Sequence, residues 1–158
     1  MFVALYPPPS ELSALSRALP SGSRLTRAAK WHVTLVFLGD IPVTPVAVVL
    51  DGIVAPPQFA LHLHGGGQFG NAAWARVEGD LGPLGELRSE VRDALAHAGF
   101  PSDDRPYRPH LTVSYRSDDP IRTALANYRG SPWRVTEFAL VESHNGEYKT
   151  VQKWPLAA

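Results

Sequence analysis

Two short segments of the chain set a histidine and a threonine two residues apart in otherwise apolar sequence. KWHVTLVFLG contains His32 and Thr34, and RPHLTVSYR contains His110 and Thr112. Because side chains alternate faces along a β-strand, each histidine shares a face with its threonine, and the apolar residues between them point the other way. If the two strands lie near each other across a groove, two imidazoles and two hydroxyls converge on one cavity.

These groups suit the chemistry of a phosphodiester, and of a strained cyclic phosphodiester in particular. Hydrolysis needs a base for the attacking water, an acid for the departing alkoxide, and donors for the phosphoryl oxygens. A histidine, with an ordinary pKa of about 6.5, serves as either acid or base near neutral pH. Threonine hydroxyls can bind the non-bridging oxygens, and an arginine can stabilise the developing charge. Such a mechanism requires no metal, and we expect neither a metal nor a cofactor.

Alternation along the strands also predicts which neighbours share each face. In the first strand, Phe37 is expected on the apolar face. In the second strand, Ser114 and Arg116 are expected on the face of His110, and Tyr115 is expected on the opposite, apolar face.

Strand and helix signals alternate along the whole chain and predict an α+β fold. Short apolar runs bounded by proline, glycine or asparagine indicate strands, and apolar residues at helical spacing indicate helices. Ser10 and Thr44 are the expected helix N-caps, and a Gly-rich turn is expected after residue 64. The predicted strands are residues 2–6, 31–38, 59–64, 72–79, 109–115, 135–143 and 147–156. The predicted helices are residues 10–19, 44–55, 84–100 and 120–128.

The length suits one domain over residues 1–158, either compact or split into two similar lobes, and the repeated His-Thr motif favours two similar lobes. The chain has 15 basic and 15 acidic residues and no cysteine. Without a polybasic tract, a small substrate or a chain end suits it better than duplex nucleic acid. The absence of cysteine excludes disulfides and thiolate metal sites. No segment has the pattern of a signal peptide or a membrane span, so we expect a soluble, cytoplasmic protein with no membrane partner. We also expect a monomer.

The two tetrads His32-Val33-Thr34-Leu35 and His110-Leu111-Thr112-Val113 resemble the signature of the two-histidine (2H) phosphoesterases. Within that superfamily the chain looks like the LigT-type RNA 2′,3′-cyclic phosphodiesterases, also called 2′-5′ RNA ligases. The resemblance extends from FVALYPP at the start to FALVESHNGEYKTVQKWPL at the end. It implies a bilobal, pseudo-twofold α+β fold in which two antiparallel sheets form a central groove with helices outside. It also implies hydrolysis of a terminal 2′,3′-cyclic phosphate to a 2′-phosphate, by cleavage of the bond to O3′.

The resemblance assigns a role to each residue of the motifs. His32 would be the acid that protonates the O3′ leaving group, and His110 the base that activates water. Thr34 and Thr112 would bind the phosphate, and Phe37 would contact the nucleoside.

The second motif departs from the family pattern at its arginine. The family usually has an arginine five residues after the second histidine, but this chain has Tyr115 there and an arginine one residue later, at Arg116. Simple alternation places Arg116 on the face of His110, so it is a candidate phosphate ligand. The other interpretation of Arg116 is an ordinary solvated arginine at a strand end.

Other patterns point less directly to function. GGGQFG satisfies a dinucleotide-binding pattern literally, but a strand-like segment follows it rather than a helix. His62 and His64 share a strand face and could begin a metal site, although no third ligand is evident from the sequence. The four tryptophans are expected mainly in the core.

Three functions remain open at this point. The first is a metal-independent phosphodiesterase acting on RNA 3′ ends or nucleoside 2′,3′-cyclic phosphates. The second is a 2′-5′ RNA ligase that uses the same site in reverse, with a 5′-hydroxyl as acceptor. The third is a nucleotide-binding module without turnover.

Overall fold

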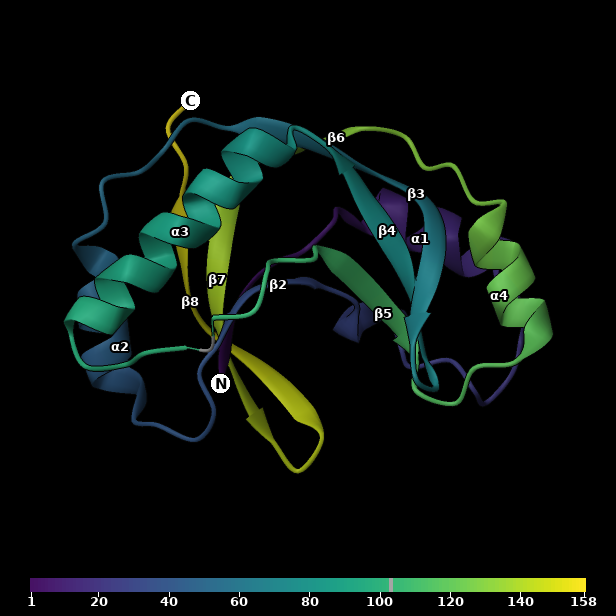
Figure 1. Ribbon diagram of the computed structural model, residues 1–158, viewed down its shortest axis with the longest axis horizontal. Helices are drawn as coiled ribbons and strands as arrows, with labels where there is room; N and C mark the ends of the chain where they lie inside the picture. The colour runs from purple at the N-terminus through teal and green to yellow at the C-terminus, as the bar shows by residue number, and fades with distance from the viewer. Residues whose placement is uncertain (103) are drawn as a thin grey trace.

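A computed structural model describes residues 1–102 and 104–158, and within these ranges it contains eight strands and four α-helices (Figure 1). The strands are β1 Phe2–Leu5, β2 Val33–Phe37, β3 Phe59–Phe69, β4 Ala72–Gly79, β5 His110–Ser114, β6 Trp133–Val135, β7 Glu137–His144 and β8 Glu147–Pro155. The helices are α1 Pro9–Ala18, α2 Val43–Asp51, α3 Leu81–His97 and α4 Asp119–Ala126, with a short 3₁₀ helix, η1, at Ala28–Lys30. The fold is α+β, as predicted.

The eight strands form one curled antiparallel sheet with the order β6-β3-β4-β5-β2-β1-β7-β8. The sequence predicted two separate sheets. The difference lies at the centre, where β2 and β5 pair through Val33 and Leu111 and so join two four-stranded halves into one sheet. Each of these two residues directly follows a motif histidine, so both motifs lie at the junction of the halves.

The helices lie at the two sides of the sheet (Figure 1). Helix α3 contacts β2 and α2 contacts β8, whereas α4 packs against β3 and β4 at the other side. The apolar spacing predicted for α3 is confirmed, because Leu84, Leu87, Val91 and Leu95 are all buried. No helix in the described part of the chain is long and apolar enough to cross a membrane.

The starts of the first two long helices differ from the prediction. Prolines precede both: Pro8 is the N-cap of α1 and Pro42 that of α2, and neither helix has a side-chain cap. Ser10 and Thr44 therefore lie inside the first turn, each at the second position of its helix, and neither hydroxyl caps the helix. In α4, by contrast, the Asp118 carboxylate accepts a 3.0 Å hydrogen bond from the backbone nitrogen of Ile121.

The glycine run after residue 64 is part of a strand, not the turn that the sequence predicted. Strand β3 continues through it to Phe69, and Gly67 pairs with Trp74 of β4. A Cβ on Gly67 would come within 2.9 Å of three atoms of the Trp74 indole ring. A Cβ on Gly66 would lie 2.7 Å from the Cβ of Leu125 in α4, so Gly66 and Gly67 are needed because a helix and an aromatic ring lie directly on them.

The C-terminal hairpin forms as predicted, with its turn at Asn145 and Gly146. Both residues have positive φ, 52° and 77°, as a tight two-residue hairpin turn requires. Trp31, Trp133 and Trp154 are buried in the core. Trp74, the fourth tryptophan, lies instead beside His110.

Candidate active site

The four motif side chains line a single cavity of about 140 Å³. His32 and Thr34 reach it from the start of β2, and His110 and Thr112 reach it from the start of β5. The remaining lining residues are Thr26, Lys30, Tyr115 and Tyr148. Among the described residues that line the cavity none carries a carboxylate, so its electrostatic character favours an anionic ligand.

Both histidines are oriented by the same backbone contact. The Nδ1 of His32 lies 2.7 Å from the carbonyl oxygen of Lys30, and the Nδ1 of His110 lies 2.6 Å from that of Arg108. A carbonyl only accepts hydrogen bonds, so each Nδ1 carries the donated proton. The Nε2 atom of each ring is therefore the one that can exchange a proton with a ligand.

Aromatic rings surround the imidazole of His32. Phe2 stacks on it with ring centroids 4.5 Å apart, and Tyr6 and Tyr148 lie at 5.8 and 5.6 Å. Burial lowers the pKa of His32 below its ordinary value of 6.5, and the nearby His110 lowers it further, while the hydrogen bond to the Lys30 carbonyl acts in the opposite direction. The free protein therefore holds His32 mainly neutral at pH 7.

His110 packs against two aromatic rings from the hairpin of β3 and β4. The Phe69 ring meets it edge-on at 5.2 Å, and the Trp74 indole lies at 5.6 Å. Trp74 in turn contacts Phe69 at 5.0 Å. These rings restrict the rotation of the His110 side chain, in addition to its hydrogen bond to Arg108.

A β-bulge directly after Thr34 changes the faces of the first motif strand. Ala4 pairs with Thr34 and Val3 with Val36, so Leu35 is an extra residue without a partner in β1. Beyond the bulge, alternation is shifted by one position. Phe37 pairs with Phe2, whose ring stacks on His32, and it is 67% exposed. The prediction that Phe37 lies on the apolar face is wrong for this reason.

The second motif strand has the same bulge at the equivalent position. Thr112 pairs with Trp74 and Ser114 with Ala73, which leaves Val113 as the extra residue. Ser114 is consequently buried, and its hydroxyl donates a 2.7 Å hydrogen bond to the carbonyl oxygen of Arg24. Tyr115 turns onto the face of His110 and lines the cavity. The faces predicted for Ser114 and Tyr115 by simple alternation are therefore wrong.

Arg116 does not line the cavity, contrary to the expectation from alternation. Its guanidinium donates a 2.8 Å hydrogen bond to the carbonyl oxygen of Ser23, and its backbone nitrogen donates to the Ser114 hydroxyl. The bulge at Val113 is the cause, because it gives the face of His110 to Tyr115 instead.

Lys30 is a cavity residue that the sequence interpretation did not single out. Its ammonium group lies 5.0 Å from the centroid of the Tyr148 ring and donates to the carbonyl oxygen of Gly146. Lys30 is the last residue of η1, so strand alternation does not apply to it, and no local pattern marks it as a cavity residue.

Thr26 and Tyr148 also line the cavity and come from distant parts of the chain. The Thr26 hydroxyl accepts a 2.9 Å hydrogen bond from the Trp31 indole. Burial raises the pKa of Tyr148, so its hydroxyl remains a neutral donor near pH 7. Neither residue belongs to a local motif, and only the folded hairpin of β7 and β8 brings Tyr148 to this place.

A family model described as the 2′-5′ RNA ligase superfamily matches residues 7–147, which include both motifs. The chain belongs to this superfamily. Three relatives are each named RNA 2′,3′-cyclic phosphodiesterase. The Geobacillus stearothermophilus protein is 29% identical over 143 residues, covering 80% of this chain and 45% of that protein. The Escherichia coli protein is 26% identical over 145 residues, covering 87% and 82%.

The third relative, from Thermus thermophilus, is 33% identical over 125 residues, covering 71% of this chain and 63% of that protein. The match thus spans about half the length of the Geobacillus member of the superfamily and under two thirds of the Thermus member. Solved structures show the same fold. E. coli LigT complexed with 3′-AMP superposes with a TM-score of 0.80 at 24% identity, covering 99% of this chain and 97% of that one.

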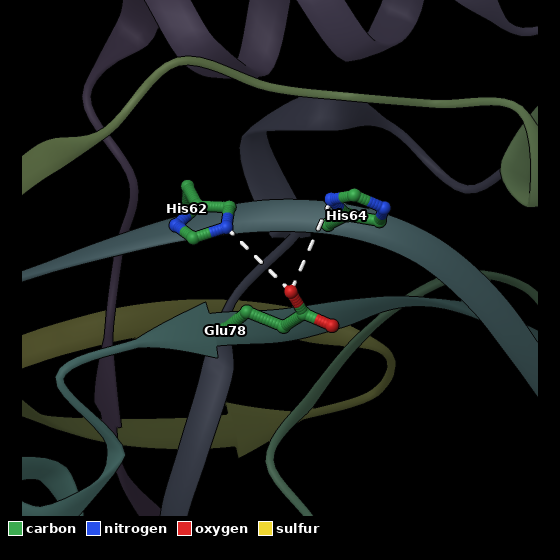
Figure 2. A group of neighbouring side chains, drawn as sticks. All are labelled: His62, His64 and Glu78. Atoms are coloured by element: carbon green, nitrogen blue, oxygen red, sulfur yellow. Dashed lines mark ion pairs between the residues drawn. The ribbon is translucent and has the colours of Figure 1, made fainter.

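One further group of side chains has the residue types of a metal site. His62 and His64 of β3 face Glu78 of β4, and Figure 2 shows one Glu78 oxygen directed at both imidazoles. The sequence identified the two histidines of this group but not the carboxylate, because that residue lies on the neighbouring strand.

Proposed function

We propose that this superfamily member hydrolyses 2′,3′-cyclic phosphates, at RNA 3′ ends or on nucleotides, to 2′-phosphates without a metal. The observation that carries the proposal is the convergence of His32 and His110 with Thr34 and Thr112 on one cavity free of carboxylates among its described lining residues. The shared name of the three relatives, RNA 2′,3′-cyclic phosphodiesterase, supports the same reaction.

The two Nε2 atoms supply the proton transfers of the proposed reaction. The Nε2 of His110 takes a proton from water as the water oxygen bonds to phosphorus. The bond from phosphorus to O3′ breaks, and the Nε2 of His32 gives its proton to O3′. The product carries a 2′-phosphate and a free 3′-hydroxyl. Each such transfer contributes a factor of roughly 10² to 10⁴ to the rate.

Substrate binding favours the protonated form of His32 that the acid role needs, with the proton taken from solvent. In the free protein, burial keeps the pKa of His32 low. A phosphodiester anion beside the ring favours the protonated imidazole, because an opposite charge within about 4–6 Å raises a histidine pKa. The bound anion thus promotes the protonation state that the departing O3′ requires.

The phosphoryl oxygens would be held by the two threonine hydroxyls and by Lys30. Lys30 is the cation among the described lining residues of the cavity, whereas Arg116 is directed to the Ser23 carbonyl. We assign to Lys30 the stabilisation of charge on the phosphoryl group during the reaction.

The two halves of the sheet would act as two pseudo-symmetric lobes with the substrate between them. The equivalent bulges support this arrangement, since they place an aromatic residue five positions after each histidine on the reactive face. Phe37 is exposed there and would contact the nucleoside. We propose that the domain works in this way as a cytoplasmic monomer.

The decisive experiment uses a nucleoside 2′,3′-cyclic phosphate in excess EDTA, with the product identified by phosphorus NMR. We expect a 2′-phosphate, with turnover reduced roughly 10² to 10⁴-fold in His32→Ala and in His110→Ala. His144→Ala, an exposed histidine at the end of β7, serves as the matched control and retains activity. A 3′-phosphate product, or a requirement for metal, would contradict the proposal.

The same assay separates the roles of the histidines and the alternative reactions. A substrate with sulfur in place of O3′ has a leaving group that needs little protonation, so His32→Ala should lose less activity on it than on the normal substrate. His110→Ala should lose activity on both equally.

An added 5′-hydroxyl acceptor that yields a 2′-5′ linkage would identify a ligase, and binding without turnover would identify a nucleotide-binding module.

A further inference from the structure

The side chains of His62, His64 and Glu78 form a second cluster of chemically active groups, outside the cavity (Figure 2). One Glu78 oxygen lies 3.6 Å from the Nε2 of His62 and 3.9 Å from the Nδ1 of His64. The three donor atoms all lie within 4.8 Å of one another. Each side chain is about one third exposed, so an ion in solution can reach the cluster.

Strand pairing explains why these groups meet. His62 and Glu78 are cross-strand partners, and partners on adjacent strands project to the same face. Leu63 pairs with Val77 and Gly66 with Ala75, so His64 lies in a bulge beside the hairpin ladder. Alternation along β3 is nevertheless kept up to His64, because Leu63 between the two histidines is buried, and the His64 imidazole points at the same carboxylate oxygen as His62.

The distances fit shared coordination better than hydrogen bonding. Separations of 3.6 and 3.9 Å exceed those of N–H···O hydrogen bonds, which are about 2.7–3.2 Å. Two ligands at about 2.0–2.2 Å from a tetrahedral ion lie roughly 3.3–3.6 Å apart, so a small side-chain rotation brings the three atoms onto one ion.

We propose that His62, His64 and Glu78 bind a divalent transition-metal ion of the zinc class. Two imidazole nitrogens and one carboxylate oxygen are a ligand set that Zn²⁺ accepts, whereas Mg²⁺ and Ca²⁺ prefer oxygen ligands. Three protein ligands leave one position of a tetrahedral ion for water or an anionic group. The site is independent of the proposed hydrolysis, which requires no metal.

The test is a Zn²⁺ titration of metal-free protein in competition with a chromophoric chelator, with no substrate present. We expect one ion per chain and an affinity at least tenfold weaker in each of His62→Ala, His64→Ala and Glu78→Gln. His97→Ala, at the end of α3, is the matched control and keeps the wild-type affinity. Circular dichroism of every variant establishes that it is folded.

A double variant, His32→Ala with His110→Ala, separates this site from the cavity. Retention of the ion by the double variant supports the proposal. Loss of the ion from the double variant with retention in Glu78→Gln would place the metal in the cavity and overturn it. If wild-type protein binds no Zn²⁺ at about 100 µM, its affinity is no better than that of a weak surface contact, and the proposal is overturned as well. Neither result depends on hydrolysis, because no substrate is used.

Discussion

Lys30 and Arg116 are two cations near the motif strands with different surroundings. The Lys30 ammonium lies over the Tyr148 ring in the cavity, and the Arg116 guanidinium is bound to a backbone carbonyl outside it. A lysine over an aromatic face is attracted to the ring and retains free donors for an anion. Charge stabilisation in the reaction should therefore depend on Lys30.

Replacement of Lys30 by Met should lower kcat/KM for a 2′,3′-cyclic phosphate about 10²-fold, since one donor to developing charge is lost. Arg116→Met should lower it less than tenfold. Lys149→Met, an exposed lysine beside Tyr148, is the control for loss of charge alone. A larger loss in Arg116→Met than in Lys30→Met, with both variants folded by thermal denaturation, would contradict the assignment.

His32 should also make the stability of the protein depend on pH. Burial lowers the folded-state pKa of His32 below 6.5, so the unfolded chain takes up this proton first as the pH falls. The stability present above pH 6.5 is then lost as the pH falls through the folded-state pKa. Urea unfolding at pH 7.5 and 5.5 should show a smaller loss in His32→Gln than in wild type.

The exposed His144 provides the comparison for this measurement. His144→Gln should lose as much stability as wild type between the same two pH values. Equal losses in wild type and His32→Gln would show that burial of His32 does not couple folding to pH.

The sequence predicted the position of a single residue correctly where the pattern that places it is local. The two His-Thr pairs lie within a few residues of one another, and period-two alternation is enough to place each pair on one face. The faces predicted for Tyr115 and Arg116 were the wrong way round. The cause is the bulge at Val113, which depends on pairing with β4 and is not encoded in any local pattern. Tyr148 belongs to the cavity through a contact with a strand more than a hundred residues away.

The β3 strand shows how packing overrides a local preference for turns. Glycine favours turns, and a run of three predicted one. In the structure these residues continue the strand, and the Trp74 indole occupies the space above Gly67 that a side chain would need. Trp74 is also in contact with His110, so the glycine supports the position of the proposed base.

Gly67→Ala should therefore destabilise the protein by about 1–3 kcal/mol, the usual cost of overpacking, and lower the rate of hydrolysis. The reason is that the added methyl group displaces the indole, which packs against His110. Urea unfolding and the hydrolysis assay measure the two effects.

Gly82→Ala in α3 is the matched control, because a Cβ there meets no atom within 4 Å. It should leave stability unchanged or raise it, since alanine is the better helix former. Equal stability of Gly67→Ala and wild type would show that the indole can move without cost.

For the whole molecule, the sequence predicted the class of fold and the internal repetition but not the number of sheets. Strand and helix signals are local, and the repeated motif indicates two related halves. The pairing of Val33 with Leu111 joins positions that are far apart in the chain, and it makes one sheet of the two halves. Pairing of this kind depends on how the halves dock, which helical or strand spacing does not determine.

The pairing of Val33 with Leu111 also ties the two motif histidines together. Each of these residues is the immediate neighbour of a motif histidine, so a single strand pair links the backbone at one imidazole to the backbone at the other. A change of register at this pair would move the two Nε2 atoms relative to each other. The spacing of the proposed acid and base is thus set by strand pairing and not by the conformation of a loop.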